Sequence, residues 1–170
     1  KKIVNILGDV LGNRKHSLHE PCFKGRENYY LNECVKSTYV SSVGKFVDKF
    51  EKDLANYVGV QYAIAVVNGT AALQISLQLS GVTRGDEVLV PTLTFVATAN
   101  AVYYLNATPH FLDCEEKNLG IDAKALRAWL KDCAEIMSDG CRNRKTGKRI
   151  RAIVLMHTFV HPSDLEELLS

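Results

Sequence analysis

Long apolar runs and a strong charge excess are both missing from this chain of 170 residues. No stretch approaches the roughly 18 consecutive apolar residues of a membrane-spanning helix, so a membrane partner is not expected. The 21 Lys and Arg residues barely outnumber the 19 Asp and Glu residues. Nucleic-acid-binding domains usually carry a strong and clustered basic excess, so nucleic acid is not an expected partner either.

The cysteine patterns of disulfide frameworks and zinc sites are also missing. The five cysteines are widely spaced and form no Cys-x-x-Cys pair. The N-terminal apolar run breaks at Gly8-Asp9 and no small-residue cleavage site follows, so a secretory signal is not expected. We therefore expect reduced thiols and a cytoplasmic location. The first residue is Lys1 instead of methionine, which is consistent with a start inside a longer reading frame.

The sequence contains neither of the common glycine-rich phosphate loops, G-x-G-x-x-G and G-x-x-x-x-G-K-[ST]. It does contain Asn68-Gly69-Thr70, a turn between an apolar run and a helical pattern. The first amides of a helix lack intrahelical acceptors, so a phosphate could bind at Gly69 and Thr70. The alternative is that Asn68 or Thr70 is only a helix N-cap, and the pattern leaves both possibilities open.

The order of apolar and periodic segments is typical of an α/β protein. We expect strands at residues 62–67, 88–90, 108–112 and 152–156, and helices at residues 3–11, 27–36, 44–57, 71–79, 96–105 and 122–131. Apolar strands separated by helices predict a mainly parallel sheet with helices on both faces. The first 37 residues are expected to form an arm with helices and a polar loop at residues 16–21.

The aromatic Phe95 and the pair His157 and His161 follow predicted strands, where the ligand sites of α/β proteins gather. The ring of Phe95 either stacks on a planar ligand or belongs to the core, and periodicity does not decide between the two. The two histidines are four residues apart, but Pro162 argues against a regular helix there. No metal site is expected.

Residues 139–151 are polar and rich in Lys and Arg. This segment either holds a diphosphate or forms a solvated hairpin or loop with turns at Gly140 and Gly147. The second interpretation is favoured because charge runs usually lie in water.

Four segments occur in the order and spacing of DegT-type aminotransferases. They are TYVSSVGKFV at residues 38–47, VNGTAAL at 67–73, VPTLTFVAT at 90–98 and MHTF at 156–159. The resemblance spans about residues 19–170. Within the family, the SSVG stretch and the basic insertion resemble the branch that aminates 4-keto-6-deoxy sugars of UDP-N-acetylhexosamine type, as in bacillosamine and legionaminic acid synthesis.

This resemblance implies part of a fold type I large domain at residues 38–170, pyridoxal 5'-phosphate (PLP) as cofactor, and a homodimer with active sites at the subunit interface. It implies that Gly69 and Thr70 bind the cofactor phosphate and that Phe95 stacks on the pyridine ring. Ser41 and Ser42 are expected to lie near the substrate. The implied reaction moves an amino group from glutamate to a nucleotide sugar, expected to be UDP-linked.

Several parts of the family pattern are not matched. The aspartate that pairs with the pyridine nitrogen and the lysine that bonds to the cofactor would lie after Ser170, and so would the small C-terminal domain. No catalytic residue is therefore assigned, and the chain alone is expected to be inactive. The family commonly has glycine where Val160 stands, so an altered turn is expected there.

Two other functions stay open at this point: a noncatalytic binding or assembly protein, and the remnant of a disrupted gene. The sequence leaves the sugar, its stereochemistry and the pathway undetermined.

Overall fold

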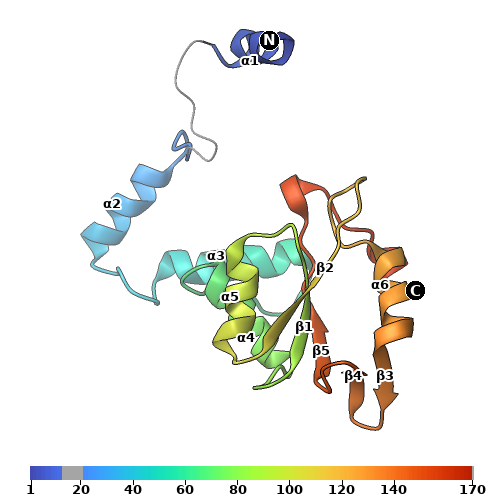
Figure 1. Cartoon of the computed structure of the whole chain (residues 1–170). Coiled ribbons are helices and arrows are strands. Elements are labelled where there is room, and N and C mark those ends of the chain that lie inside the picture. The colour runs from blue at the N-terminus through green and yellow to red at the C-terminus, as the bar shows by residue number, and fades with distance from the viewer. Residues whose placement is uncertain (13–20, 170) are drawn as a thin grey trace. The chain divides into compact units, whose positions relative to one another are not determined.

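The computed structural model describes residues 1–12 and 21–169 (Figure 1). The chain divides into two compact units, Lys1–Ala65 and Val66–Ser170. Within the described residues, no helix is both long and apolar enough to cross a membrane. The polar loop predicted at residues 16–21 lies almost wholly outside the described residues.

The described residues of the first unit form three helices, α1 (Lys2–Leu11), α2 (Glu27–Ser37) and α3 (Lys45–Val58). All three were predicted from the sequence to within two residues. Helix α3 is amphipathic, and it ends at Gly59, whose φ of 77° places it in the left-handed region where glycine is favoured. Helices α2 and α3 are joined by residues 38–44. Together with this connection they line a groove that is described below.

The strand predicted at residues 62–67 is wrong, because the structure assigns none there. Three of its apolar side chains, those of Tyr62, Ile64 and Val67, are 75%, 81% and 88% exposed. The sequence pattern is that of a buried strand, but a strand also needs a neighbour for its backbone hydrogen bonds. No described residue supplies that neighbour.

The second unit contains a five-stranded sheet in the order β2-β1-β5-β4-β3. The strands are β1 (Glu87–Pro91), β2 (Thr108–Leu112), β3 (Ala134–Met137), β4 (Gly140–Asn143) and β5 (Arg149–Ile153). Strand β1 pairs in parallel with both β2 and β5, and the β3–β4 hairpin adds two antiparallel strands beside β5. The predicted mainly parallel α/β sheet is confirmed, and the hairpin makes it mixed.

Helices cover both faces of the sheet. The side chains of Val88 and Val90 pack with α4 (Gly69–Leu79) and α5 (Val96–Tyr104), in a cluster that includes Leu77 and Val102. The intervening Leu89 points to the opposite face, where it packs with residues that include Leu112 and, on α6 (Ala123–Cys133), Leu126. This alternation follows from the two-residue period of a strand, and it confirms helices on both faces.

The connections place two helix N-termini at one edge of the sheet. Helix α4 leads through a short connection into the start of β1, and α5 begins just after β1 ends. Both helices therefore run opposite to the strands, and they pack against each other. Their N-termini lie at the level where β1, β2 and β5 end, which we call the carboxyl edge.

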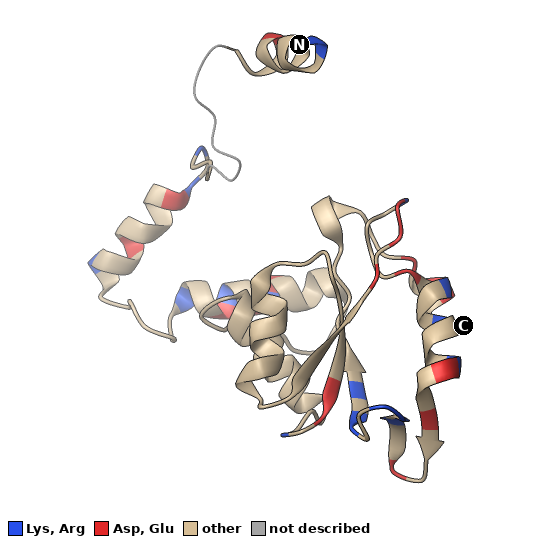
Figure 2. Cartoon of the chain, viewed as in Figure 1, with Lys and Arg blue, Asp and Glu red and all other residues tan. Residues whose placement is uncertain are grey.

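The basic segment at residues 139–151 lies at the opposite edge, because β5 starts within it and pairs in parallel with β1. It contains β4 and the loop to β5, where Figure 2 shows several Lys and Arg positions together. Gly140 and Gly147 have φ values of 127° and 70° at its turns. The hairpin interpretation is confirmed, and the segment is not on the edge that carries Gly69 and Phe95.

Two buried carboxylates hold this segment to the start of β1. The Asp86 carboxylate accepts hydrogen bonds from Arg149 Nε at 3.0 Å and from Arg149 Nη2 at 2.9 Å. The Glu87 carboxylate, in a residue only 1% exposed, accepts from Asn143 Nδ2 at 2.9 Å and Thr146 Oγ1 at 2.7 Å. Asn143, Thr146 and Arg149 therefore anchor the insertion to the start of β1.

The Arg149–Asp86 pair predicts a pH-dependent stability. Burial raises the pKa of the Asp86 carboxyl, but hydrogen bonds from Arg149 and Thr83 outweigh it and hold that pKa below its usual 3.8. A lowered native pKa contributes stability above the unfolded pKa of about 3.9, and that stability is lost as the pH falls through the native value. Replacing Arg149 with glutamine should lower the free energy of unfolding by about 2 kcal/mol near neutral pH, the usual contribution of hydrogen bonds to a charged group.

The penalty should shrink as the pH is lowered below about 4, where protonation of Asp86 weakens the pair in the wild type. Urea titrations followed by the fluorescence of Trp129, the single tryptophan, measure this at both pH values. Arg84 is exposed and lines the same surface pocket as Asp86 and Arg149, so Arg84→Gln is the matched control and should cost little. An Arg149→Gln penalty that is equal at both pH values would contradict the assignment.

The turn after β5 has a strained backbone. It forms a short 3₁₀ segment, η1 (Thr158–Val160), before α7 (Leu165–Leu169). Phe159 and Val160 have φ values of 50° and 69°. The left-handed region costs an L-residue roughly 1–2 kcal/mol, and a β-branched residue there is an outlier. The altered turn that we expected at Val160 takes this form: valine occupies the backbone conformation that suits glycine.

Replacing Val160 with glycine should therefore raise the free energy of unfolding by roughly 0.5–1 kcal/mol, which is the relieved strain less the entropy that glycine adds to the unfolded chain. The Val160 side chain is 92% exposed, so the change removes almost no buried surface. Thermal unfolding of Val160→Gly and Val160→Ala tests this, and alanine should gain less because it keeps its Cβ. A lower midpoint for Val160→Gly would show that the turn is not strained.

Candidate functional site

The candidate site lies at the carboxyl edge of the second unit. The topology places the N-termini of α4 and α5 and the turn after β5 at this edge. The turn before α4 is organised by Asn68. Its Oδ1 accepts a hydrogen bond from the Ala71 amide at 2.9 Å, and its carbonyl accepts from the Ala72 amide at 3.1 Å. Asn68 is therefore the N-cap of α4.

This cap leaves the next two residues available. Within the described part of the chain, the amides of Gly69 and Thr70 and the hydroxyl of Thr70 have no hydrogen-bond partner. A Cβ added to Gly69 would meet nothing within 4 Å, so open space lies in front of the turn. Two unpaired amides at the positive end of a helix and one hydroxyl form a suitable donor set for a phosphate.

Phe95 occupies the corresponding place before α5. It is the N-cap residue of that helix, and its side chain is 69% exposed. Phe95 is thus not a core residue, which removes one of the two interpretations of the sequence. A large aromatic ring held at the carboxyl edge is available to stack on a planar ligand.

Sequence reasoning missed the pair of hydroxyl groups beside Phe95. Thr94 Oγ1 donates a hydrogen bond to Thr98 Oγ1 at 2.8 Å, and Thr98 is 5% exposed. The four-residue spacing of two threonines is common on helices, so it gave no signal by itself. We return to this pair below.

His157 is held by the segment that follows η1. Its Nδ1 accepts a hydrogen bond from the Ser163 amide at 3.1 Å, while Ser163 Oγ donates to the Met156 carbonyl at 3.0 Å. The neutral ring then carries its proton on Nε2. No group of three or more His, Cys, Asp and Glu side chains suited to a metal occurs in residues 1–12 and 21–169.

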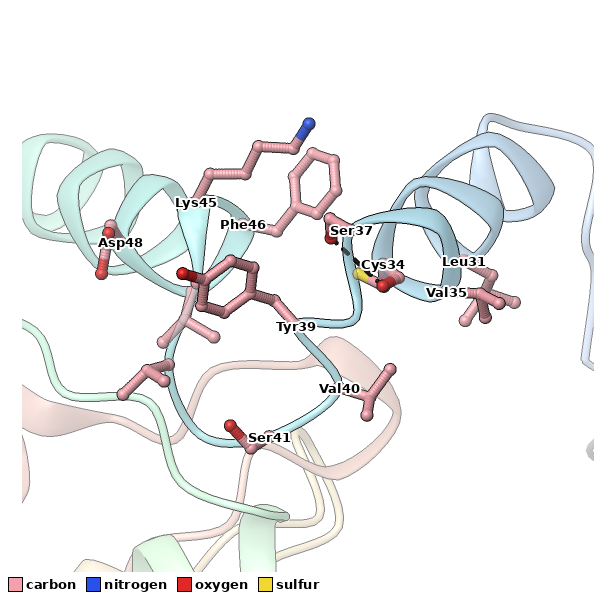
Figure 3. Close-up of a pocket in the computed structure, with 13 residues that line it drawn as sticks. Leu31, Cys34, Val35, Ser37, Tyr39, Val40, Ser41, Lys45, Phe46 and Asp48 are labelled. Carbon is pink, nitrogen blue, oxygen red and sulfur yellow. Dashed lines mark hydrogen bonds between the residues drawn. The ribbon is translucent and has the colours of Figure 1, made fainter.

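Ser41 and Ser42, the predicted substrate-side residues, lie in the first unit between α2 and α3, and both are exposed. Ser41 lines an open groove of about 790 Å³ together with Tyr39 of the same connection and with residues of both helices, among them Leu31 and Phe46 (Figure 3). The two serines and the carboxyl edge belong to different units, so their approach to a substrate stays a prediction.

Three lysines of the second unit lie away from the carboxyl edge or in solvent. Lys148 donates from Nζ to Thr108 Oγ1 at 2.8 Å, at the start of β2. Lys145 lies in the loop before β5, and Lys131 is exposed on the last turn of α6. None of these three has the place that a cofactor-bound lysine would need.

Comparison with known proteins identifies the family to which this chain belongs. The profile of the DegT/DnrJ/EryC1/StrS aminotransferase family matches residues 21–170. The GDP-perosamine synthase of Escherichia coli O157:H7 is 37% identical over 151 residues, which are 89% of this chain and 37% of that protein. This chain thus spans well under half the length of such relatives.

Solved structures show the same partial coverage. An aminotransferase from Psychrobacter cryohalolentis matches with a TM-score of 0.70 and 29% identity, over 88% of this chain and 34% of that one. NtdA from Bacillus subtilis, solved with the bound cofactor PMP, matches with a TM-score of 0.67 and 25% identity, over 92% of this chain and 34% of that one. The neighbours have the fold of PLP-dependent transferases, so the predicted fold type I is confirmed.

A profile match over nearly the whole chain, together with the shared fold, establishes the family. The chain belongs to the DegT/DnrJ/EryC1/StrS aminotransferase family, whose members depend on pyridoxal 5'-phosphate.

Proposed function

We propose that this chain supplies the phosphate-binding and ring-stacking part of a PLP-dependent sugar aminotransferase. The complete protein would move an amino group from glutamate to a 4-keto-6-deoxy nucleotide sugar. The observation that carries the proposal is the turn before α4, where the Asn68 cap leaves two amides and the Thr70 hydroxyl unpaired among the described residues. These donors fit the cofactor phosphate.

Each residue has a separate task in this proposal. Gly69 and Thr70 hold the phosphate and so fix one end of the cofactor. Phe95 covers one face of the pyridine ring and excludes water from it. When bound, PLP supplies the electron sink that allows an amino group to be moved between carbon atoms.

The substrate side is proposed from Ser41 and Ser42, which lie on the loop between α2 and α3. The proposal of a uridine nucleotide rests on the similarity of the SSVG stretch and the basic insertion to one branch of the family. Guanosine is the nucleotide in the name of the relatives from Escherichia coli and Caulobacter vibrioides. Uridine or guanosine diphosphate, added as a competitor of sugar binding to the complete protein, would separate the two.

The remaining features are proposed from family membership. Residues 1–37 would be an arm, residues 38–170 would be part of the cofactor-binding domain, and the protein would act as a cytoplasmic homodimer. No residue of this chain is assigned the role of the cofactor-bound lysine or of the aspartate at the pyridine nitrogen. We therefore propose that the chain by itself does not transaminate.

Asn68 and Thr70 should respond to substitution in different ways. Thr70→Ala should weaken PLP binding about 10-fold, because a hydrogen bond to a charged group contributes roughly 1.5 kcal/mol or more, while stability stays nearly constant. Asn68→Ala should lower the free energy of unfolding by about 1 kcal/mol through loss of the cap. Calorimetric titration with PLP and urea unfolding measure the two effects.

Ser76→Ala, an exposed position on the same helix, is the control and should change neither quantity. If Thr70→Ala bound PLP as tightly as the wild type, the phosphate-binding role would be wrong and the turn would be a plain helix start.

Incubation with PLP followed by borohydride tests the assignment of the lysines. We expect scattered, substoichiometric labelling of exposed lysines, because no lysine of this chain is assigned to the cofactor. Peptide mass spectrometry locates the label. A single lysine labelled at one equivalent per chain would overturn the proposal that the chain lacks a cofactor-bound lysine.

A further inference from the structure

The segment between β1 and α5 holds an exposed aromatic ring on a backbone that is fixed at both ends. At its start, the Thr92 amide donates to the Leu112 carbonyl at 2.9 Å, which continues the pairing of β1 with β2. At its end, the Thr98 amide donates to the Phe95 carbonyl at 3.0 Å. Phe95 therefore projects from a short connection with little backbone freedom.

A side-chain hydrogen bond also holds this connection. Thr94 Oγ1 donates to Thr98 Oγ1 at 2.8 Å, so the residues on either side of Phe95 are joined across the first turn of α5. Thr98 is 5% exposed, whereas Phe95 is 69% exposed. A buried acceptor thus fixes the base of an exposed ring.

The start of α5 has Phe95 as its N-cap residue, and no side-chain hydrogen bond caps the helix among the described residues. The Thr94 hydroxyl donates its hydrogen bond to the side chain of Thr98, within the first turn of α5. The bond contributes to the position of the connection and leaves the helix start without a side-chain cap.

We propose that Thr98 is a positioning residue for the cofactor ring, acting through Thr94 and the backbone on the orientation of Phe95. This rests on the proposed function, in which Phe95 stacks on the pyridine ring. A ring that is already oriented loses less conformational freedom when a ligand binds. Without the hydroxyl at residue 98, the ring of Phe95 would have to become ordered when the ligand binds.

The test uses the 170-residue chain with three probes: PLP, pyridoxal and inorganic phosphate. Thr98→Val keeps the shape of the buried side chain and removes its acceptor. It should weaken binding of PLP and of pyridoxal about 3- to 10-fold, the range that corresponds to ordering one side chain. Binding of inorganic phosphate should be unchanged, because its donors lie on α4. Thr98→Ser restores the hydroxyl and should bind PLP like the wild type.

A ligand-free measurement separates positioning from a general loss of structure. With ¹³C-labelled phenylalanine, the ring resonances of Phe95 should broaden or shift in Thr98→Val, while those of Phe46 in the first unit stay in place. Thr94→Val removes the donor at a less buried position, so it provides the same test if Thr98→Val does not fold. It should weaken the binding of PLP and of pyridoxal and leave the binding of inorganic phosphate unchanged.

Phe95→Leu distinguishes failure of this inference from failure of the proposed function. If Phe95→Leu weakens PLP binding but Thr98→Val and Thr94→Val bind like the wild type, Phe95 stacks and Thr98 does not position it. If the wild type binds no PLP, or Phe95→Leu has no effect, the stacking role itself is wrong and the inference falls with it. Equal losses for pyridoxal and inorganic phosphate in Thr98→Val would also overturn the inference.

Discussion

The parallel pairing of β1 with β2 and β5 determines where the other parts of the second unit lie. In a parallel arrangement all three strands end at the same edge, and each connection must return along a face of the sheet. Since α4 leads into β1 and α5 leads out of it, both helices start at the carboxyl edge. This constraint alone places the turn at Gly69 and Thr70 and the ring of Phe95 at the same edge of the sheet.

The opposite edge has a different task. Here the carboxyl groups of Asp86 and Glu87 are almost completely buried at the start of β1. Arg149 compensates Asp86 through two hydrogen bonds, whereas Glu87 is held by the neutral donors Asn143 and Thr146. Asn143, Thr146 and Arg149 of the basic insertion therefore stabilise the start of β1, at the edge opposite Gly69 and Phe95.

Local patterns in the sequence were enough to predict what depends on local interactions. Helix α3 and the strand at residues 88–90 were predicted from the spacing of apolar residues, and the helix predicted at residues 71–79 begins two residues earlier, at Gly69. The hairpin at residues 139–151 followed from its charge and its glycines. Motifs that occur in a fixed order also identified the family, although no single motif is specific.

What the sequence did not show depends on contacts between distant residues. Residues 62–67 have the composition of a buried strand, but strand formation depends on a partner that local composition does not supply. The hydroxyl pair at Thr94 and Thr98 is invisible because many threonines at that spacing make no such bond. The choice of Asn68 over Thr70 as the cap likewise required the geometry of the turn.

The exposed segment at residues 62–67 also affects how this chain behaves during synthesis. The run is made before any strand of the sheet, since β1 starts only at Glu87. Its apolar side chains are exposed and, among the described residues, its backbone pairs with no strand, so it offers a template to another extended chain, including another nascent copy. Because an encounter between copies depends on their concentration, the yield of correctly folded protein should depend on how fast the chain is produced as well as on its stability.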